Sequence, residues 1–253
     1  MLPVIHVGPL VLQTPGLILI LGLWLGLSLI EKYADQAPVR SDRLYNLVLV
    51  GLLSWLVGAR LFYTVQHSAA FLQSPASIFA LSPVMMDWGG GLLAGVLGAW
   101  IYAQRTGLAG WQTLDALTPF LGVFMLALGL SHLASGEAYG LPADLPWSID
   151  LWGTRRHPTQ VYETILAAVV VAVVWPGRRR RGEKQAWPAG IIFLTYVALS
   201  ALSQLAVDPF RAEGQGALRW VQWGAWIGLA ISLYLIGEKR FGGNSPDTKP
   251  EMQ

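Results

Sequence analysis

The sequence contains no cysteine, and this absence removes several kinds of chemistry. A chain without thiols forms no disulfide, builds no thiolate metal site and has no catalytic cysteine of its own. Histidine is scarce as well, since its four residues are scattered and no two form the i, i+4 pair of a helical metal site. We therefore expect a protein that needs no metal and no other cofactor.

Charge is the second shortage. Only 13% of the 253 residues are charged, against about 25% in soluble domains. The formal net charge is +2 and no basic stripe with interleaved aromatic residues is present, so nucleic acid is not an expected partner. Hydrophobic residues make up 54% of the chain, and its twelve tryptophans suit a protein with two water–lipid interfaces. The composition indicates an integral membrane protein.

Membrane-spanning helices need about 20 mostly apolar residues. About seven such runs are present, the third of them short and glycine-rich, so we predict an all-α, polytopic membrane domain over residues 1–241. Residues 1–13 have no basic start, and we expect no cleaved signal peptide. The predicted spans are Pro15–Ile30, Tyr45–Val65, Gly90–Ala103, Leu114–Ala134, Gln160–Trp175, Pro188–Val207 and Leu218–Ile236.

The segments between and after these spans have distinct compositions. Residues 66–83 are typical of an arm or an interfacial segment, and residues 135–158 of a loop or small head. Residues 242–253 form a polar tail that we expect to be disordered.

The distribution of basic residues predicts the orientation in the membrane. With the N-terminus outside, the cytoplasmic side receives 12 of the 17 Lys and Arg residues, among them the run Arg178–Arg181. Short positive loops stay in the cytoplasm. We therefore expect the C-terminus in the cytoplasm and the head outside, in the inner membrane of a bacterium.

The segment Arg155–Glu163, with the sequence RRHPTQVYE, begins the apolar helix whose N-terminal end is the most polar. Pro158 suits the first helical turn, where its missing amide would be unpaired anyway. Helical spacing places His157, Gln160 and either Glu163 or Thr164 on one face. A carboxylate carried into lipid is rare and usually functional.

Further ionisable groups lie in or beside the predicted spans, and most gather toward the outer side. One interpretation is a set of ion pairs that fixes the helices, for instance Arg60 with Glu163 and Arg211 with Glu137. The other is a cavity for an anionic lipid headgroup, in which guanidinium groups bind phosphate. Asp115 lies near the inner face, where helix capping or a pair with Arg105 is expected. His132 is alone on an apolar helix, where a hydrogen-bonded core histidine is the common case.

Several short motifs stand in a fixed order along these spans. A glycine-rich stretch, Gly90–Ala103, accompanies them. The motifs are GARLFY at Gly58–Tyr63, D-x-x-x-P at Asp115–Pro119, SGEAYG at Ser135–Gly140, RHPTQVYE at Arg156–Glu163 and DPFRAE at Asp208–Glu213.

Together these motifs resemble those of the bacterial prolipoprotein diacylglyceryl transferase family over nearly the whole chain. The resemblance implies a seven-helix inner-membrane enzyme with a periplasmic head. Such an enzyme moves diacylglyceryl from phosphatidylglycerol to the lipobox cysteine of a preprolipoprotein and releases glycerol phosphate. We expect a monomer surrounded by membrane lipid. The matching positions are Arg60, Glu137, Gly140, His157, Gln160, Tyr162, Glu163 and Arg211, with Asp208 in place of a glutamate.

The chain also departs from the family pattern. The family's helix-three histidine is here Gly89, the arginine of helix four is Gly129, and that of helix six is Gln204. Two asparagines of helix four correspond to His132 and Ser135, and the tyrosine of the first helix to Pro15.

These matches and departures lead to a set of expected site residues. We expect Glu137, His157 or His132 to take the proton of the acceptor thiol, the last as a replacement for the missing imidazole. The expected headgroup-binding residues are Arg60, Arg211, Gln160, Tyr162, Glu163, Gly140 and Asp208. Losing a preorganised charge-stabilising donor typically costs about 10²–10³-fold in rate. Two alternatives therefore stay open: a catalytically silent paralogue that binds lipid or a lipoprotein-pathway partner, and a small-solute transporter. No internal repeat of the kind common in transporters is present.

Overall fold

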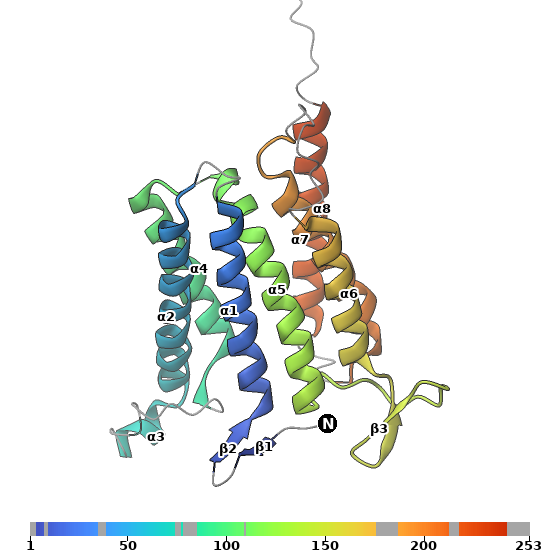
Figure 1. Cartoon of the computed structure of the whole chain (residues 1–253). Coiled ribbons are helices and arrows are strands. Elements are labelled where there is room, and N and C mark those ends of the chain that lie inside the picture. Colours follow the sequence, from blue (N-terminus) through green and yellow to red (C-terminus); the bar gives the residue numbers. More distant parts are fainter. Residues whose placement is uncertain are drawn as a thin grey trace, which may run out of the picture. The chain divides into compact units, whose positions relative to one another are not determined.

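A computed structural model describes residues 4–7, 10–34, 39–73, 77, 85–108, 110–175, 187–212 and 218–241 of the chain. It divides into two compact units, each considered by itself: Met1–Tyr33 with Leu114–Gln253, and Ala34–Thr113. The predicted tail at residues 242–253 lies outside the described residues, as do residues 74–76 and 78–83 of the predicted arm at residues 66–83. Figure 1 shows the helices in sequence colours.

Helices occupy all seven ranges that the apolar runs predict, which confirms the all-α prediction. Four of them are long and apolar enough to cross a membrane, while the helix that begins at Thr159 is shorter. The number of spans therefore stays a prediction. The helices are α1 (Thr14–Ala34), α2 (Ser41–Gln66), α3 (Ser68–Gln73), α4 (Trp88–Thr106), α5 (Trp111–Ser135), α6 (Thr159–Val174), α7 (Ile191–Val207) and α8 (Leu218–Phe241).

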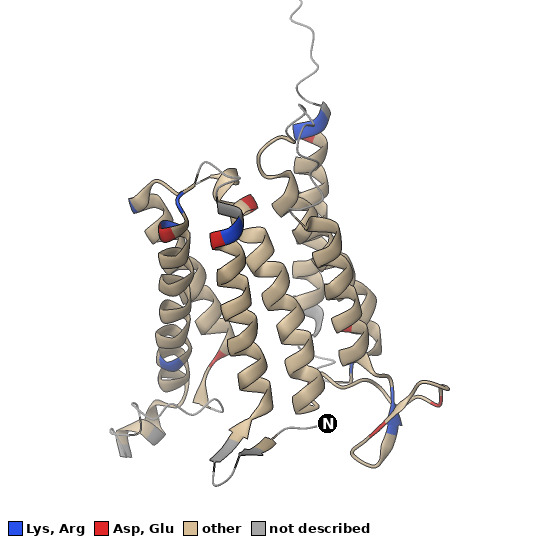
Figure 2. Cartoon of the chain, in the orientation of Figure 1, with Lys and Arg blue, Asp and Glu red and all other residues tan. Residues whose placement is uncertain are grey.

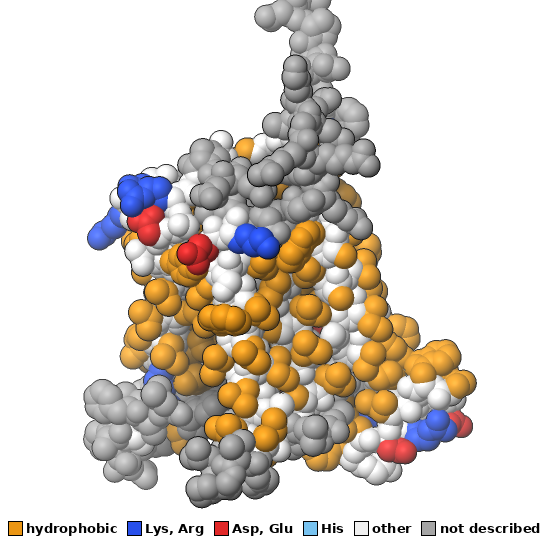
Figure 3. All heavy atoms as spheres, viewed as in Figure 1, with side chains coloured by type: hydrophobic (Ala, Val, Ile, Leu, Met, Phe, Trp, Pro, Cys, Tyr) orange, Lys and Arg blue, Asp and Glu red, His pale blue; other side chains and the backbone are white. Residues whose placement is uncertain are grey.

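Large apolar side chains cover the outside of these helices. Trp24 of α1, Leu53 of α2 and Tyr234 of α8 are all more than half exposed. In each unit, charged residues lie mainly near the helix ends (Figure 2), and hydrophobic side chains cover the stretches between them (Figure 3). A surface of this kind suits a lipid solvent. The chain is thus a multi-pass membrane protein.

The smaller unit is built on the contact between α2 and α4. Glycines make this contact: a Cβ added at Gly95 would lie 3.1 Å from the Trp55 Cβ, and one added at Gly91 2.9 Å from the Ala59 Cβ. Small residues allow membrane helices to approach closely where packing, not burial from water, holds them together. Asp87 caps α4 by accepting a hydrogen bond from the Gly90 amide.

In the larger unit, Asp115 joins α5 to the start of α7. Its two carboxylate oxygens accept hydrogen bonds from the backbone amides of Gly190, at 2.6 Å, and Phe193, at 2.9 Å. These amides belong to the first turn of α7, which has no partner for them within the helix. The expected capping role of Asp115 is confirmed, with the difference that the capped helix is α7.

Two hairpins complete the described chain. Strand β1 (Val4–Val7) pairs antiparallel with β2 (Leu10–Gln13), and β3 (Ile149–Leu151) with β4 (Thr154–Arg156). The second hairpin lies within the predicted head at residues 135–158, so that segment has strand structure as well as loops. A short 3₁₀ helix, η4 (Asp208–Phe210), follows α7 directly.

Candidate functional site

Three connecting segments of the larger unit are joined by backbone hydrogen bonds. Leu141 donates to the Phe210 carbonyl at 2.8 Å, and Ala212 donates to the Tyr139 carbonyl at 2.9 Å. His157 donates to the Leu141 carbonyl at 3.0 Å, which adds the segment before α6. The motifs SGEAYG, RHPTQVYE and DPFRAE, far apart in sequence, are thereby brought to one place.

Gly140 stands where these segments approach most closely. A Cβ at this position would overlap the His157 carbonyl oxygen and lie 2.6 Å from the His157 Cβ. Any side chain would push the segments apart. Gly140 also forms an isolated β-bridge with Arg211, so its close packing positions that arginine.

The loop after α5 is fastened to the start of α6 by two buried side chains. The Thr159 hydroxyl donates to the Ala138 carbonyl at 2.7 Å, and the Gln160 amide donates to the Glu137 carbonyl at 2.9 Å. Ala138 is held in the left-handed region with φ 53°, which costs about 1–2 kcal/mol for a residue other than glycine. These contacts hold the backbone at Glu137, whose side chain is exposed.

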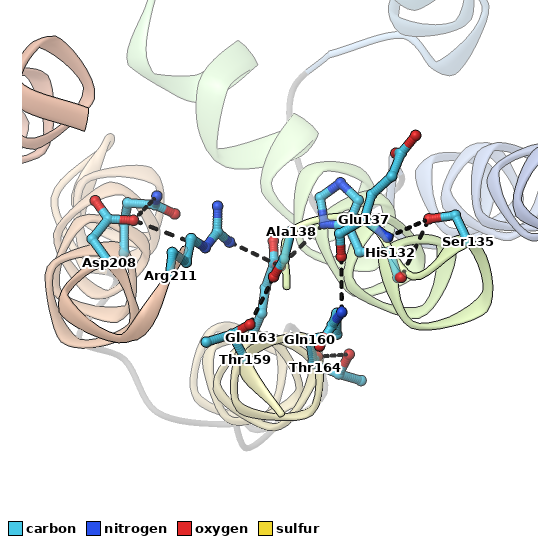
Figure 4. Close-up of polar contacts among 11 residues, drawn as sticks. His132, Ser135, Glu137, Ala138, Thr159, Gln160, Glu163, Thr164, Asp208 and Arg211 are labelled. Carbon is cyan, nitrogen blue, oxygen red and sulfur yellow. Dashed lines mark hydrogen bonds and ion pairs between the residues drawn. The ribbon is translucent and has the colours of Figure 1, made fainter. Parts of the chain in front are cut away.

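A three-membered ionic cluster lies between the helix ends. The Glu163 Oε2 atom is 3.1 Å from the His132 Nδ1 atom and 2.9 Å from the Arg211 Nη2 atom. The side chains of Glu163, Arg211 and His132 are 12%, 17% and 21% exposed. Figure 4 shows them meeting from α5, α6 and the segment after η4. A carboxylate this deeply buried needs such compensation.

Asp208 continues the polar groups beyond Arg211. It is 1% exposed, it accepts a hydrogen bond from the Gln204 side chain, and its Oδ1 atom lies 4.0 Å from the Arg211 Nε atom. Among the described residues, Asp208 Oδ2, Arg211 Nε and Gln160 Oε1 are buried without a hydrogen-bond partner. A buried polar atom left unpaired costs about 1–3 kcal/mol. The site therefore has hydrogen-bonding capacity that its described residues leave unused.

His157 and Tyr162 lie in an aromatic group beside the ionic cluster. The ring of His157 is centred 5.0 Å from that of Phe210, and its Nδ1 atom is 3.5 Å from the Tyr162 hydroxyl. The Tyr162 hydroxyl accepts a hydrogen bond from Trp147 at 2.8 Å. His157 precedes α6, with Pro158 as the N-cap and not within the first turn as expected. The predicted shared helical face of His157 and Glu163 is therefore not formed.

Arg60 belongs to the smaller unit and is buried there. Its guanidinium donates to the backbone carbonyls of Met85, at 2.8 Å, and Ser77, and it lies 5.2 Å from the centre of the Phe71 ring. These contacts hold Phe71, Ser77 and Met85 against α2. The ion pairs expected from the sequence, Arg60 with Glu163 and Arg211 with Glu137, are not the ones formed. Arg211 pairs with Glu163 instead, and Glu137 is exposed.

Gly129 and Gly89, which stand where the family pattern has an arginine and a histidine, differ in the space available for a side chain. A Cβ at Gly129 would lie 2.9 Å from the Thr164 hydroxyl oxygen and 3.2 Å from its Cα atom, so α5 and α6 are in close contact there. A Cβ at Gly89 would meet only an Asp87 carboxylate oxygen, at 3.5 Å. The first position has no room for a long side chain, and the second is open.

Two features of this site were missed by sequence reasoning. The Gln204–Asp208 hydrogen bond could have been predicted from the sequence, because polar residues four positions apart share one helical face. The left-handed conformation of Ala138 has none, because alanine is not a residue that favours positive φ.

Comparison with known proteins gives a consistent result. A family model described as prolipoprotein diacylglyceryl transferase matches residues 3–237. Three relatives are each named phosphatidylglycerol–prolipoprotein diacylglyceryl transferase. The protein of Nitratidesulfovibrio vulgaris is 30% identical over 96% of this chain and 95% of its own. That of Geobacter sulfurreducens is 30% identical over 81% and 80%, and that of Nostoc sp. 27% over 90% and 86%.

Proposed function

We propose, from the fact that the chain belongs to the prolipoprotein diacylglyceryl transferase family, that it acts on the substrates for which its relatives are named. The donor is phosphatidylglycerol, and the acceptor is the cysteine thiol in the lipobox peptide of a preprolipoprotein. The thiol sulfur forms a bond to the glycerol carbon that carries the phosphate. The carbon–oxygen bond breaks, and glycerol phosphate leaves.

The observation that carries this proposal is the ionic cluster of Glu163, His132 and Arg211. The departing phosphate gains negative charge, and a preorganised donor beside it lowers the barrier. Arg211 has this role: one terminal nitrogen binds Glu163, and the other points away from both Glu163 and Asp208 (Figure 4). Its buried Nε atom faces the Asp208 carboxylate at 4.0 Å.

The remaining expected residues divide by the contacts that they make. Gly140 and Gln160 position the segments around Arg211, since one allows close packing and the other binds a backbone carbonyl. Asp208 orients Arg211 from the opposite side. We assign headgroup contacts to Tyr162 in the larger unit and, separately, to Arg60 in the smaller unit. Proton transfer is assigned to Glu137, His157 or His132. The exposed carboxylate of Glu137 is open to an incoming peptide.

We also propose the finer details of location. The domain of residues 1–241 lies in the bacterial inner membrane as a monomer, with the N-terminus outside and the C-terminus in the cytoplasm. The basic run Arg178–Arg181 supports this orientation through its positive charge. The head at residues 135–158 then faces outward, where secreted peptides arrive.

The comparisons favour neither alternative raised by the sequence. A silent paralogue predicts that phosphatidylglycerol copurifies with the protein but that no product forms. A solute transporter predicts uptake into sealed vesicles, and its path requires polar groups through the whole membrane thickness. In the larger unit, the ionic cluster joins the last turn of α5, the beginning of α6 and the residue after η4.

The test is transfer by the purified full chain in vesicles of phosphatidylglycerol, with a lipobox peptide as acceptor and mass spectrometry as readout. We expect a peptide heavier by one diacylglyceryl group, joined through sulfur. A serine-for-cysteine peptide is the matched control and stays unmodified. A folded protein that modifies neither peptide would refute the proposed function.

A further inference from the structure

We propose that His132 is the base that takes the proton from the acceptor thiol, and that Glu163 is the positioning residue that holds its ring. This inference rests on the proposed transfer to a thiol. It assigns the proton-transfer step to one histidine, which corresponds to an asparagine in the family pattern.

The hydrogen bond between the two side chains determines which ring nitrogen is basic. An ionised carboxylate only accepts hydrogen bonds, so the His132 Nδ1 atom, 3.1 Å from Glu163 Oε2, carries the hydrogen. The neutral ring then has its lone pair on Nε2. Within the described part of the chain, this atom has no hydrogen-bond partner and is not among the buried unpaired atoms. It is therefore available to a substrate.

Glu163 is itself held firmly. Arg211 donates to the same carboxylate oxygen from the side opposite His132 (Figure 4). This contact fixes the carboxylate, and the carboxylate fixes the tautomer and the ring plane of His132. When the ring takes a proton, the resulting imidazolium already faces a negative charge. A buried carboxylate has this supporting role in Ser-His-Asp triads.

Gly129 explains how His132 reaches α6. It lies three residues before His132, on the same face of α5, and its backbone is pressed against Thr164. A larger residue at this position would separate the two helices and draw His132 away from Glu163. The glycine and the histidine therefore act together as one arrangement.

The other two expected proton acceptors are less suited to the step. The ring of His157 is packed beside Phe210 and its Nδ1 atom faces the Tyr162 hydroxyl. Glu137 is exposed, and a carboxylate is a weaker base toward a thiol than an imidazole is. His132 combines a suitable base with a fixed orientation.

The proton balance of the step is complete. The thiol proton moves to His132 Nε2, and the thiolate sulfur bonds to the glycerol carbon as the carbon–oxygen bond breaks. The electron pair of that bond goes to the phosphate oxygen. The imidazolium then returns its proton to the released glycerol phosphate, and the histidine is neutral again.

A selenocysteine peptide tests the assignment, because a selenol is ionised at neutral pH and needs no base. We compare transfer to the cysteine and selenocysteine forms of one lipobox peptide, each relative to the unaltered protein. His132→Ala is expected to lose about 10²–10⁴-fold with cysteine, the usual contribution of a general base, and under about tenfold with selenocysteine. Imidazole added to the assay restores part of the loss.

Two further variants guard against loss of folding. His132→Asn keeps a hydrogen-bond donor toward Glu163 and has no basic nitrogen, so it shows the same selective loss. Glu163→Gln loses less than His132→Ala, again mainly with cysteine. His67→Ala replaces an exposed histidine directly after α2; it is the matched control and leaves both rates unchanged. Equal losses on both peptides, or no loss with folded variants, would overturn the assignment of His132. An unaltered protein that modifies neither peptide overturns the proposed function instead.

Discussion

Replacing Asp115 should destabilise the protein without touching the ionic cluster. The carboxylate accepts hydrogen bonds from two amides in the first turn of α7, at 2.6 and 2.9 Å. A hydrogen bond to a charged group contributes about 1.5–3 kcal/mol, and losing a cap costs about 0.5–2 kcal/mol. Because the site is half-buried and water can replace part of the interaction, we expect Asp115→Ala to cost about 2–4 kcal/mol.

The assay is thermal unfolding in detergent, followed by circular dichroism. For a chain of this size, 1 kcal/mol corresponds to roughly 2–4 °C, so Asp115→Ala should lower the melting temperature by roughly 5–15 °C. Asp115→Asn keeps one acceptor oxygen, and its melting temperature should lie between those of Asp115→Ala and the unaltered protein. Asp42→Ala removes an exposed carboxylate in the first turn of α2 together with its ion pair to Arg40; it is the matched control and should lower the melting temperature far less. If Asp115→Ala melts like the control, the capping argument is wrong.

Three further predictions concern the site and its surroundings. Gly140→Ala should abolish transfer, because the added methyl group overlaps a backbone carbonyl. Gly16→Ala has open space around it and should keep its activity. Equal activities of the two variants in a transfer assay would contradict the packing argument. Gly89→His should keep the melting temperature of the unaltered protein, because that position is open, whereas Gly129→Arg should lower it. A Gly89→His protein that melts below the Gly129→Arg protein would refute this. Arg60→Ala should raise amide hydrogen exchange near Ser77 and Met85, whose carbonyls Arg60 binds. Unchanged exchange there would show that these contacts are not stabilising.

Much of the fold is predictable from the sequence because hydrophobicity alone identifies helices in a membrane. The boundaries are less predictable. The last predicted span ends at Ile236, whereas α8 continues through Lys239 and Arg240 to Phe241. Hydropathy falls where charges begin, but the helical hydrogen bonds continue past that point. The same difference extends α2 back to Ser41.

The contacts of the site are harder to predict than its members. The partners of Glu163 come from α5 and from the segment after η4, 31 and 48 residues away in sequence. Helical periodicity places residues on a face, but it does not say which face of which helix lies opposite. Arg60 illustrates the same limit, because it binds the backbone carbonyls of Ser77 and Met85, 17 and 25 residues away, and backbone partners carry no sequence signal.

The most direct test of the central claim is the rate of glycerol phosphate release, measured together with thioether formation from phosphatidylglycerol and a lipobox peptide. The account predicts one glycerol phosphate released for each thioether formed. It also predicts that Arg211→Ala lowers both rates together by about 10²–10³-fold. The rates of Arg211→Lys should lie between those of Arg211→Ala and the unaltered protein. Folded Arg211→Ala protein that keeps the full rate, or glycerol phosphate released without thioether, would contradict it.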